Sequence, residues 1–450
     1  MKLKIAFLLL LLAILSPFPV QAEIRVDADF PGGNVKVESI DQGASRTGGE
    51  DEVMSPNASV SAQPSSNQEP TLSGANVVCV RPDLRDTKSN YFYFYFRVTG
   101  AENRTVTFKF PEKSTNFGAV GPNVSVDGGK TWKYLGEKDY YASGTKFPAD
   151  QHEFTWSFGP NDSDVRFAFG TPYTQSNWDE FMAQYRARED VRFETLCRSR
   201  LDKRDVELFR VPYLGQGKPR FYLAFTARHH ACESSASPVM EGMISFCLSD
   251  APEAQWLRQN AEIVFIPFMD KDGVEDGDQG KNRSPHDHNR DYVQELYPSV
   301  KAFKALIVKE SEGIPLVFMD LHAPNIRGGN NEFYYSHGPI EMEKMNPIWN
   351  RFREKLTENQ KDGTLKYESK RDVPGRSDGK YNSIRSFTGK DGNLSSSRVW
   401  IQGLPNAYFA NCMEFGYSLC GNAIITPVSG RELGRNVMKT LAEILQEAKE

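Results

Sequence analysis

Two short segments of the chain carry residue types that bind transition metals. His230 and Glu233 stand three residues apart, directly after the apolar run 221–226. A second apolar run, 316–321, is followed at once by His322. Two imidazoles and one carboxylate are the protein ligands of many catalytic zinc sites, which leave a fourth position open for water. The sequence therefore predicts one zinc ion held by His230, Glu233 and His322.

Each part of this set also has an ordinary structural explanation. A lone His-x-x-Glu pattern is common in exposed polar loops. Asp320 fits either a carboxylate that orients a metal-bound histidine or a plain acid at a strand end. His229 precedes His230, but only His230 has the three-residue spacing to Glu233. The combination of two histidines at strand ends with one glutamate favours the metal site.

Strands must bring these residues together, since they lie about 90 positions apart in the sequence. After residue 173, short apolar runs alternate with amphipathic segments, which predicts an α/β domain with a mixed, mostly parallel central sheet. Open sheets of this kind bind ligands beyond the carboxyl ends of their strands. The predicted strands are 221–226, 261–267, 316–321 and 423–427.

The first part of the chain, 23–172, has a different pattern. Short alternating or aromatic-rich runs are separated by Gly, Pro, Asn and Asp, which predicts an all-β sandwich domain before the catalytic domain at 173–450. A polar stretch, 42–73, predicts a long mobile loop within it. The predicted strands of the sandwich are 91–98, 105–110, 123–126, 130–135, 153–158 and 165–169.

The first 22 residues have the pattern of a cleavable secretory signal. Two lysines precede an apolar run at 5–15, and Val20-Gln21-Ala22 resembles a cleavage site. We therefore expect a secreted or periplasmic protein. Six cysteines are an even number, so disulfides are possible in such a compartment, although their pairing cannot be deduced.

The remaining composition argues against two classes of partner. The net charge is −5 and the basic residues are scattered, so we expect no nucleic-acid binding. No apolar run after residue 22 approaches the roughly 18 residues that span a bilayer, so we expect no membrane insertion. The sequence does not predict the oligomeric state.

Further motifs, taken in order, resemble a known enzyme family. After the His-x-x-Glu segment come a strand ending in Asp272-Gly273, the pair Asn289-Arg290, the strand ending in His322, and Glu414 after a last strand. This order resembles the zinc carboxypeptidases typified by pancreatic carboxypeptidase A. Within that family it resembles the cytosolic carboxypeptidase branch, in which a β-sandwich precedes the catalytic domain. The resemblance covers residues 85–450 and implies a phosphorylase/hydrolase-like α/β fold of the carboxypeptidase type.

The resemblance also implies roles for individual residues. The three predicted metal ligands match those of the family. Asn289 and Arg290 match the pair that grips the terminal carboxylate of the substrate, and a guanidinium fork suits that task. Glu414 matches the glutamate that takes a proton from the attacking water and passes it to the leaving amine.

A cation is also needed to stabilise the oxyanion of the transition state. The family uses an arginine upstream of the Asn-Arg pair, and here Arg283 or Lys281 are the candidates. We favour Arg283, although both also fit solvated loop charges. Two departures from the family are clear: Cys232 replaces a substrate-binding arginine, and no tyrosine lies between Tyr381 and Tyr408 to match the one on the mobile loop.

The sequence thus predicts a secreted zinc carboxypeptidase that hydrolyses the C-terminal bond of peptides or proteins. One alternative is a zinc amidohydrolase that acts on acylated amino acids or cell-wall peptides. A second alternative is a non-catalytic binding protein on the same scaffold. The Asn289-Arg290 pair favours a substrate with a carboxylate in either enzyme, and Glu414 beside a full ligand set argues against the binding protein.

Overall fold

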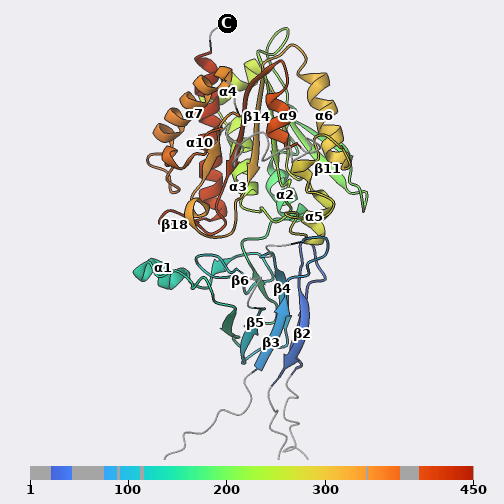
Figure 1. Ribbon diagram of the computed structural model, residues 1–450, viewed down its shortest axis with the longest axis vertical. Helices are drawn as coiled ribbons and strands as arrows, with labels where there is room; N and C mark the ends of the chain where they lie inside the picture. Colours follow the sequence, from blue (N-terminus) through green and yellow to red (C-terminus); the bar gives the residue numbers. More distant parts are fainter. Residues whose placement is uncertain are drawn as a thin grey trace, which may run out of the picture.

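The chain folds into two small sheets that lie below a larger sheet with its helices (Figure 1). This computed structural model describes residues 22–42, 76–88, 92–111, 116–340, 343–375 and 395–448. The segments 1–21 and 43–73, on which the signal and the mobile-loop predictions fall, lie outside the described residues. The two regions are described in turn because the larger one contains the predicted site residues.

The N-terminal region contains a five-stranded and a four-stranded sheet, which share one aromatic core. Phe96 of the first sheet packs on Phe108 of the second with ring centroids 5.6 Å apart. The first sheet has the order β1 (Arg25–Asp27), β4 (Tyr95–Thr99), β9 (Val165–Ala168), β6 (Asn123–Ser125) and β7 (Lys133–Tyr134). The second has the order β2 (Lys36–Asp41), β3 (Asn76–Arg81), β5 (Thr105–Lys109) and β8 (Glu153–Ser157).

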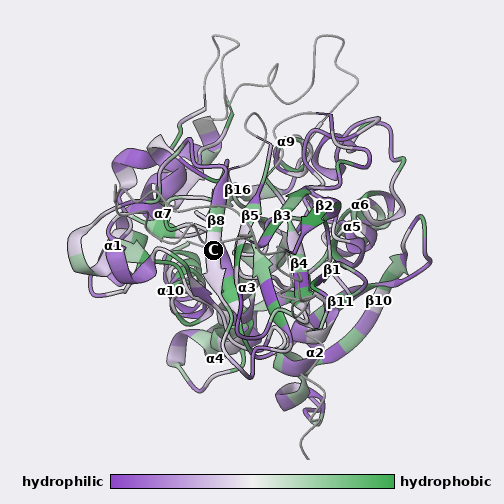
Figure 2. Ribbon diagram, turned by 90° about the horizontal axis from the view of Figure 1, so that it is seen from below, coloured by the Kyte–Doolittle hydropathy of each residue, from purple (hydrophilic) through white to green (hydrophobic). Residues whose placement is uncertain are grey.

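A short helix in this region was not predicted. Helix α1 (Glu137–Ser143) follows β7 and lies at the edge of the molecule, where Figure 2 shows it as mostly hydrophilic. Its one buried side chain is Tyr140, whose hydroxyl donates to the carbonyl of Gly421 at 3.2 Å. Seven residues are too few for a helical period to stand out from the sequence.

The larger sheet is mixed, and its four middle strands are parallel, as the sequence predicts. Its order is β10 (Arg192–Arg198), β11 (Asp205–Val211), β13 (Ala261–Ile266), β12 (Phe221–Ala227), β14 (Leu316–His322), β16 (Ala407–Glu414) and β15 (Tyr335–His337). The segment 423–427 is not part of it. There β18 (Ala423–Ile424) pairs only with β17 (Leu419–Cys420), because Thr426 already caps the next helix.

Helices cover both faces of this sheet, on opposite sides in Figure 1. Side chains along β12 alternate between the two cores, Leu223 to one and Tyr222 to the other, so the strand is apolar throughout. One face carries α2 (Gln175–Met182), α3 (Ala236–Cys247), α4 (Pro252–Asn260), α7 (Asn346–Asn359) and α10 (Pro427–Gln446). The other carries α6 (Pro298–Glu310) and α9 (Ser397–Gln402), and the short α5 (Lys271–Asp276) follows β13.

Helices α3 and α10 pack with their backbones in close approach at two glycines. A Cβ atom on Gly434 would lie 1.9 Å from the carbonyl oxygen of Val239, and one on Gly242 would lie 2.1 Å from that of Arg431. Both contacts are far shorter than real Cβ contacts, so the crossing requires glycine on each helix. Helix α3 begins three residues after Glu233, and this crossing therefore holds the segment that carries a predicted metal ligand.

We expect Gly434→Ala to destabilise the protein by about 1–3 kcal/mol, because the added methyl group meets backbone that cannot move aside. The direction of this stability change is informative, because alanine is otherwise favoured over glycine in a helix by about 1 kcal/mol. Urea denaturation measures the difference. Gly159→Ala is the control, because its nearest neighbour is 3.5 Å away, and its change should stay within about 0.5 kcal/mol. An unchanged or raised stability of Gly434→Ala would contradict the close crossing.

Candidate metal and active site

Strand register places polar residues in two rows on one face of the larger sheet. Side chains two residues apart on a strand point to the same face, and paired residues on neighbouring strands lie side by side. Across β12, β14, β16 and β15 the rows are Thr226–Asp320–Cys412–His337 and His322–Glu414–Tyr335. They lie at the carboxyl ends of the parallel strands, where the sequence predicts the site.

The three predicted metal ligands come together at this edge. His230 and Glu233 lie in the turn after β12, where the amide of Glu233 donates to the carbonyl of His230. Nδ1 of His230 is 2.8 Å from one carboxylate oxygen of Glu233, and Nδ1 of His322 is 2.8 Å from the other. One ligand atom from each residue lies within 4.8 Å of the others.

The far nitrogen of each ligand histidine faces a second carboxylate. Nε2 of His322 is 2.7 Å from Asp320, and Nε2 of His230 is 3.5 Å from Asp287. Such carboxylates fix the ring orientation and raise the basicity of metal-binding histidines. Both Nδ1 atoms are thereby directed at the same place, so the residues present fit a divalent metal with two nitrogen ligands and one carboxylate.

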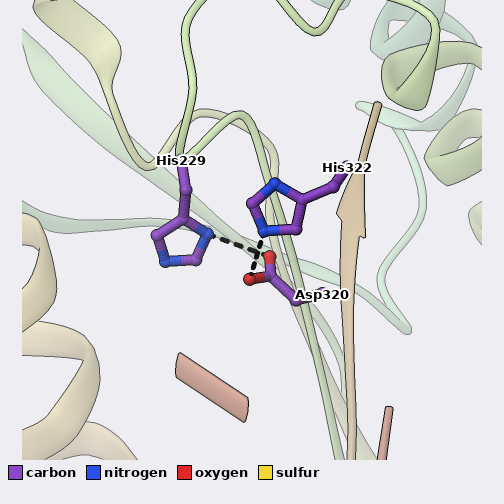
Figure 3. Close-up of side chains that lie close together, drawn as sticks. All are labelled: His229, Asp320 and His322. Carbon is purple, nitrogen blue, oxygen red and sulfur yellow. Dashed lines mark hydrogen bonds and ion pairs between the residues drawn. The ribbon is translucent and has the colours of Figure 1, made fainter. Parts of the chain in front are cut away.

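Asp320 is also bound by residues outside the ligand set. Figure 3 shows its carboxylate between the imidazoles of His229 and His322, and Nδ1 of His229 lies 2.9 Å from it. The hydroxyls of Thr226 and Ser397 donate to the same carboxylate at 2.7 and 2.5 Å. These four partners surround the fully buried charge of Asp320. His229 is therefore a hydrogen-bond partner of Asp320 and does not compete with His230 for the metal.

Charges around the ligands favour the ionised carboxylate. Burial alone would raise the pKa of Glu233, but the charges of His230, Lys281 and His322 hold it well below its ordinary value. Lys281 is half-buried, with 17% of its side chain exposed, and its Nζ lies 2.7 Å from Glu233. Burial lowers the pKa of Lys281, yet Glu233 outweighs that effect and the pKa is raised. The ammonium group therefore stays charged beside the predicted metal ligands.

Asn289, Arg290 and Glu414 line one cavity of about 530 Å³ together with the three predicted metal ligands. Asn289 and Arg290 belong to the short 3₁₀ helix η2 (His288–Arg290). The side-chain nitrogen of Asn289 lies 2.8 Å from Nε2 of His322, and its side-chain oxygen accepts from the amide of Ser397 at 2.9 Å, which fixes the side chain at the cavity wall. Glu414 ends β16, and its side chain is 13% exposed.

The sequence did not point to all residues of this cavity. Asp287 faces His230 from an irregular loop, where the sequence shows no helical or strand periodicity. Its position two residues before Asn289 was the one indication that it lies near the site. Tyr335 and His337 come from β15, a three-residue edge strand that no apolar run announced. His337 lies 3.4 Å from Glu414. Burial raises the pKa of Glu414, but this contact and the charge of His322 lower it overall.

Arg283, the cation that the sequence favoured, is not among the residues that line this cavity. Its guanidinium is bound by three carboxylates, those of Asp86 at 2.8 Å, Asp278 at 2.9 Å and Asp270. Only 6% of the side chain is exposed. The prediction is therefore corrected: Arg283 neutralises acids outside the cavity, whereas the alternative, Lys281, lines the cavity, as Arg290 and Arg398 also do.

We expect Arg283→Met to lower the free energy of unfolding by about 3–5 kcal/mol, because Asp270 would remain buried without its partner. Chemical denaturation provides the measurement. Arg81→Met is the matched control, since Arg81 pairs with Glu38 at the surface and its loss should cost at most about 1 kcal/mol. Equal effects of the two substitutions would contradict the structural role of Arg283.

The known proteins that this chain resembles in sequence include several cytosolic carboxypeptidases. The chain is 26% identical over 266 residues to cytosolic carboxypeptidase 6 of Caenorhabditis elegans, which covers 54% of this chain and 56% of that protein. It is 28% identical over 267 residues to cytosolic carboxypeptidase 3 of mouse, covering 54% of this chain and 26% of the relative. The chain thus spans between a quarter and somewhat over half of these relatives. No family model matches it.

These relatives contradict the predicted secreted or periplasmic location, because they are named cytosolic and point to the cytosol instead. The apolar leader pattern on which the prediction rested lies outside the described residues. The six cysteines all lie in described parts of the chain, and all are free thiols, so the disulfides considered possible for an oxidising compartment are not formed. Among the described residues, no helix is both long and apolar enough to cross a membrane.

Solved structures resemble nearly the whole chain. A metallo-carboxypeptidase from Burkholderia cenocepacia superimposes with a TM-score of 0.67 at 16% identity, covering 94% of this chain and 99% of that one. A metallo-carboxypeptidase from Pseudomonas aeruginosa gives 0.65 at 21% identity with the same coverage. The resemblance that the motifs predicted is confirmed: the chain has the metallocarboxypeptidase fold and is related in sequence to the cytosolic carboxypeptidases.

Proposed function

We propose that the protein is a zinc carboxypeptidase that hydrolyses the C-terminal bond of peptides or proteins. One observation carries the proposal: the ligand set, the Asn289-Arg290 pair and Glu414 line the same cavity. A single zinc ion would be held by His230, Glu233 and His322 and would supply Lewis-acid polarisation of the scissile carbonyl.

The residues of the cavity divide the remaining work. Arg290 offers a planar fork to the terminal carboxylate, and the neighbouring Asn289 amide is already fixed in place. Glu414 would take a proton from the attacking water and pass it to the leaving amine. One of its oxygens, Oε2, is buried and has no hydrogen-bond partner among the described residues, which favours a carboxylate open to a proton. Lys281 would stabilise the oxyanion with its charge.

Two further features of the proposal concern the rest of the chain. We take residues 23–172 as a β-sandwich domain and 173–450 as the catalytic domain. Lys146 of the first pairs with Glu332 of the second, and the hydroxyl of Tyr134 donates to the carbonyl of Tyr417 at 2.8 Å. These contacts support a fixed position of the sandwich beside the loops that follow β14 and β16. The expected partners are peptide or protein C-termini.

The catalytic glutamate is tested by Glu414→Gln, which keeps the shape of the side chain and removes its basicity. We expect kcat for peptide hydrolysis to fall by about 10²–10⁴-fold, the contribution of a positioned base. Hydrolysis of peptides with free C-termini, by purified protein of each variant, is the measurement. Glu153→Gln, an exposed acid of β8, is the control and should keep full activity. Undiminished turnover of Glu414→Gln would exclude this residue as the base.

The requirement for a free carboxylate separates the carboxypeptidase from the amidohydrolase alternative. Peptides with amidated C-termini should be cleaved far more slowly than the free acids, because Arg290 then has no carboxylate to grip. The same panel measures both rates. Equal rates on the two forms would favour an amidohydrolase whose substrate is not recognised at its end.

Two experiments test the metal site: removal of the metal, and substitution of Asp320, the carboxylate beside His322. Dialysis against a chelator should release zinc and abolish hydrolysis, and added zinc should restore it. We expect Asp320→Asn to weaken zinc binding by about 10–100-fold, as for other carboxylates behind metal-bound histidines. Competition with a chromogenic chelator measures the affinity. Asp362→Asn, at a side chain that is 90% exposed, is the control. Unchanged zinc affinity in Asp320→Asn would contradict the positioning role.

A further inference from the structure

A buried tyrosine to which the proposed reaction assigns no step lies behind the predicted metal site. Tyr292 is 1% exposed and follows η2 in the chain. Its hydroxyl lies 2.9 Å from Nε2 of His229, and Nδ1 of the same ring lies 2.9 Å from the carboxylate of Asp320. We propose that Tyr292 is a positioning residue of the metal site, which acts on His322 through His229 and Asp320. This inference rests on the zinc site of the function proposed above.

The four side chains form one continuous series of polar contacts. Figure 3 shows its three inner members, with the Asp320 carboxylate between the imidazoles of His229 and His322. Tyr292 extends the series at the far nitrogen of His229. At the other end, Asp320 lies 2.7 Å from Nε2 of His322, and Nδ1 of that ring faces the predicted metal ligand Glu233. The tyrosine hydroxyl is therefore connected to a metal ligand through two other side chains.

The available acceptors determine the direction of these hydrogen bonds. The ionised carboxylate of Asp320 can only accept, so Nδ1 of His229 must donate to it. Burial raises the pKa of Tyr292 well above its ordinary value, so the hydroxyl keeps its proton. In the described part of the chain, Nε2 of His229 is the one hydrogen-bond partner of this hydroxyl. Because a buried donor without an acceptor is costly, Tyr292 donates to Nε2, and His229 carries its ring proton on Nδ1.

This tautomer of His229 keeps Asp320 in its position beside His322. Oδ1 of Asp320 faces Nδ1 of His229, and Oδ2 faces Nε2 of His322. If the ring proton of His229 moved to Nε2, Nδ1 would present a lone pair to the carboxylate, and the two would repel each other. Tyr292 prevents this change, because its hydroxyl uses the lone pair of Nε2. The orientation of the carboxylate, and with it that of the metal-binding ring, therefore depends on the tyrosine.

Packing holds Tyr292 in place independently of its hydroxyl. Its ring contacts Phe303 of α6 and Trp400 of α9, with centroids 6.3 and 5.8 Å apart. Its backbone carbonyl accepts from the ammonium group of Lys304 at 2.9 Å. The substitution Tyr292→Phe keeps the ring that makes these contacts and removes only the hydroxyl. It therefore separates the hydrogen bond to His229 from the packing of the two helices.

Zinc affinity of the full-length protein, measured by competition with a chromogenic chelator, tests the positioning role. Tyr292→Phe should weaken zinc binding by about 3–10-fold, the effect of one hydrogen bond. His229→Asn keeps a side-chain N–H for Asp320 but is too short to reach Tyr292. In that background, Tyr292→Phe should change the affinity by less than about twofold, because the two residues act together. Tyr222→Phe is the matched control and should bind zinc as the wild type does, since Tyr222 is equally buried and its hydroxyl donates to Glu310.

Magnetic resonance of the imidazole nitrogens reports on the tautomer, which packing alone does not set. We would record zinc-loaded protein with isotope-labelled histidines and identify His229 among the seven histidines by the loss of its signals in His229→Asn. The wild type should show the ring proton of His229 on Nδ1. Tyr292→Phe should shift the Nε2 resonance of the same ring, because that nitrogen loses its donor, and Tyr222→Phe should leave it unchanged.

The possible outcomes separate this inference from the proposed function. Unchanged zinc affinity in Tyr292→Phe, or an equal loss in the His229→Asn background, overturns the positioning role. A proton on Nε2 of His229 in the wild type overturns the tautomer. Thermal unfolding verifies that each variant is folded; if His229→Asn is not, the affinity and the resonance shift of Tyr292→Phe against Tyr222→Phe still decide. A wild type that binds no zinc overturns the zinc site and this inference together, whereas zinc binding that is indifferent to Tyr292→Phe contradicts the inference alone.

Discussion

The fully buried carboxylate of Asp320 is the interaction on which the site depends. A buried charge is tolerated only when partners surround it, and here two imidazoles and two hydroxyls do so. Burial alone would raise the pKa of Asp320, but His229 and His322 lower it, so the group stays charged. These partners come from β12, from the turn after it, from β14 and from α9. One carboxylate therefore connects four segments through hydrogen bonds, and these bonds fix the orientation of His322.

Regular and irregular parts of the chain make different contributions to the site. The sheet provides two rows whose spacing is fixed by backbone hydrogen bonds, and these rows include His322, Glu414 and Asp320. The turn after β12 and the loop that precedes η2 provide the rest, including Glu233 and Lys281. Arg283, a residue of this loop, connects it to Asp86 of the N-terminal region. The N-terminal sheets thereby contribute to the geometry of a cavity whose lining comes from the other region.

The extent to which the sequence predicted the site follows this division. Three middle strands of the larger sheet were predicted within one or two residues, because buried parallel strands are continuously apolar and end in turn residues. The residues predicted to bind the metal were chosen for the same reason, because they stand at or soon after the ends of two of these strands. β15 and α1 were missed, since three and seven residues carry too little periodicity to be distinguished from loop. His337 was therefore missed with its strand, although it lies against Glu414.

The choice between Lys281 and Arg283 could not be made from spacing, because two residues in an irregular loop can face opposite ways. The balance of charge decides it. Asp270 and Asp278 are almost fully buried, and Arg283 is the cation bound to both. Were Arg283 turned toward the cavity, the buried carboxylate of Asp270 would lose its guanidinium partner at a cost of several kcal/mol, while Asp278 would keep only Arg85. Lys281, in contrast, pairs with Glu233 and lines the cavity. The acids that bind Arg283 thus determine which of the two cations lines the cavity.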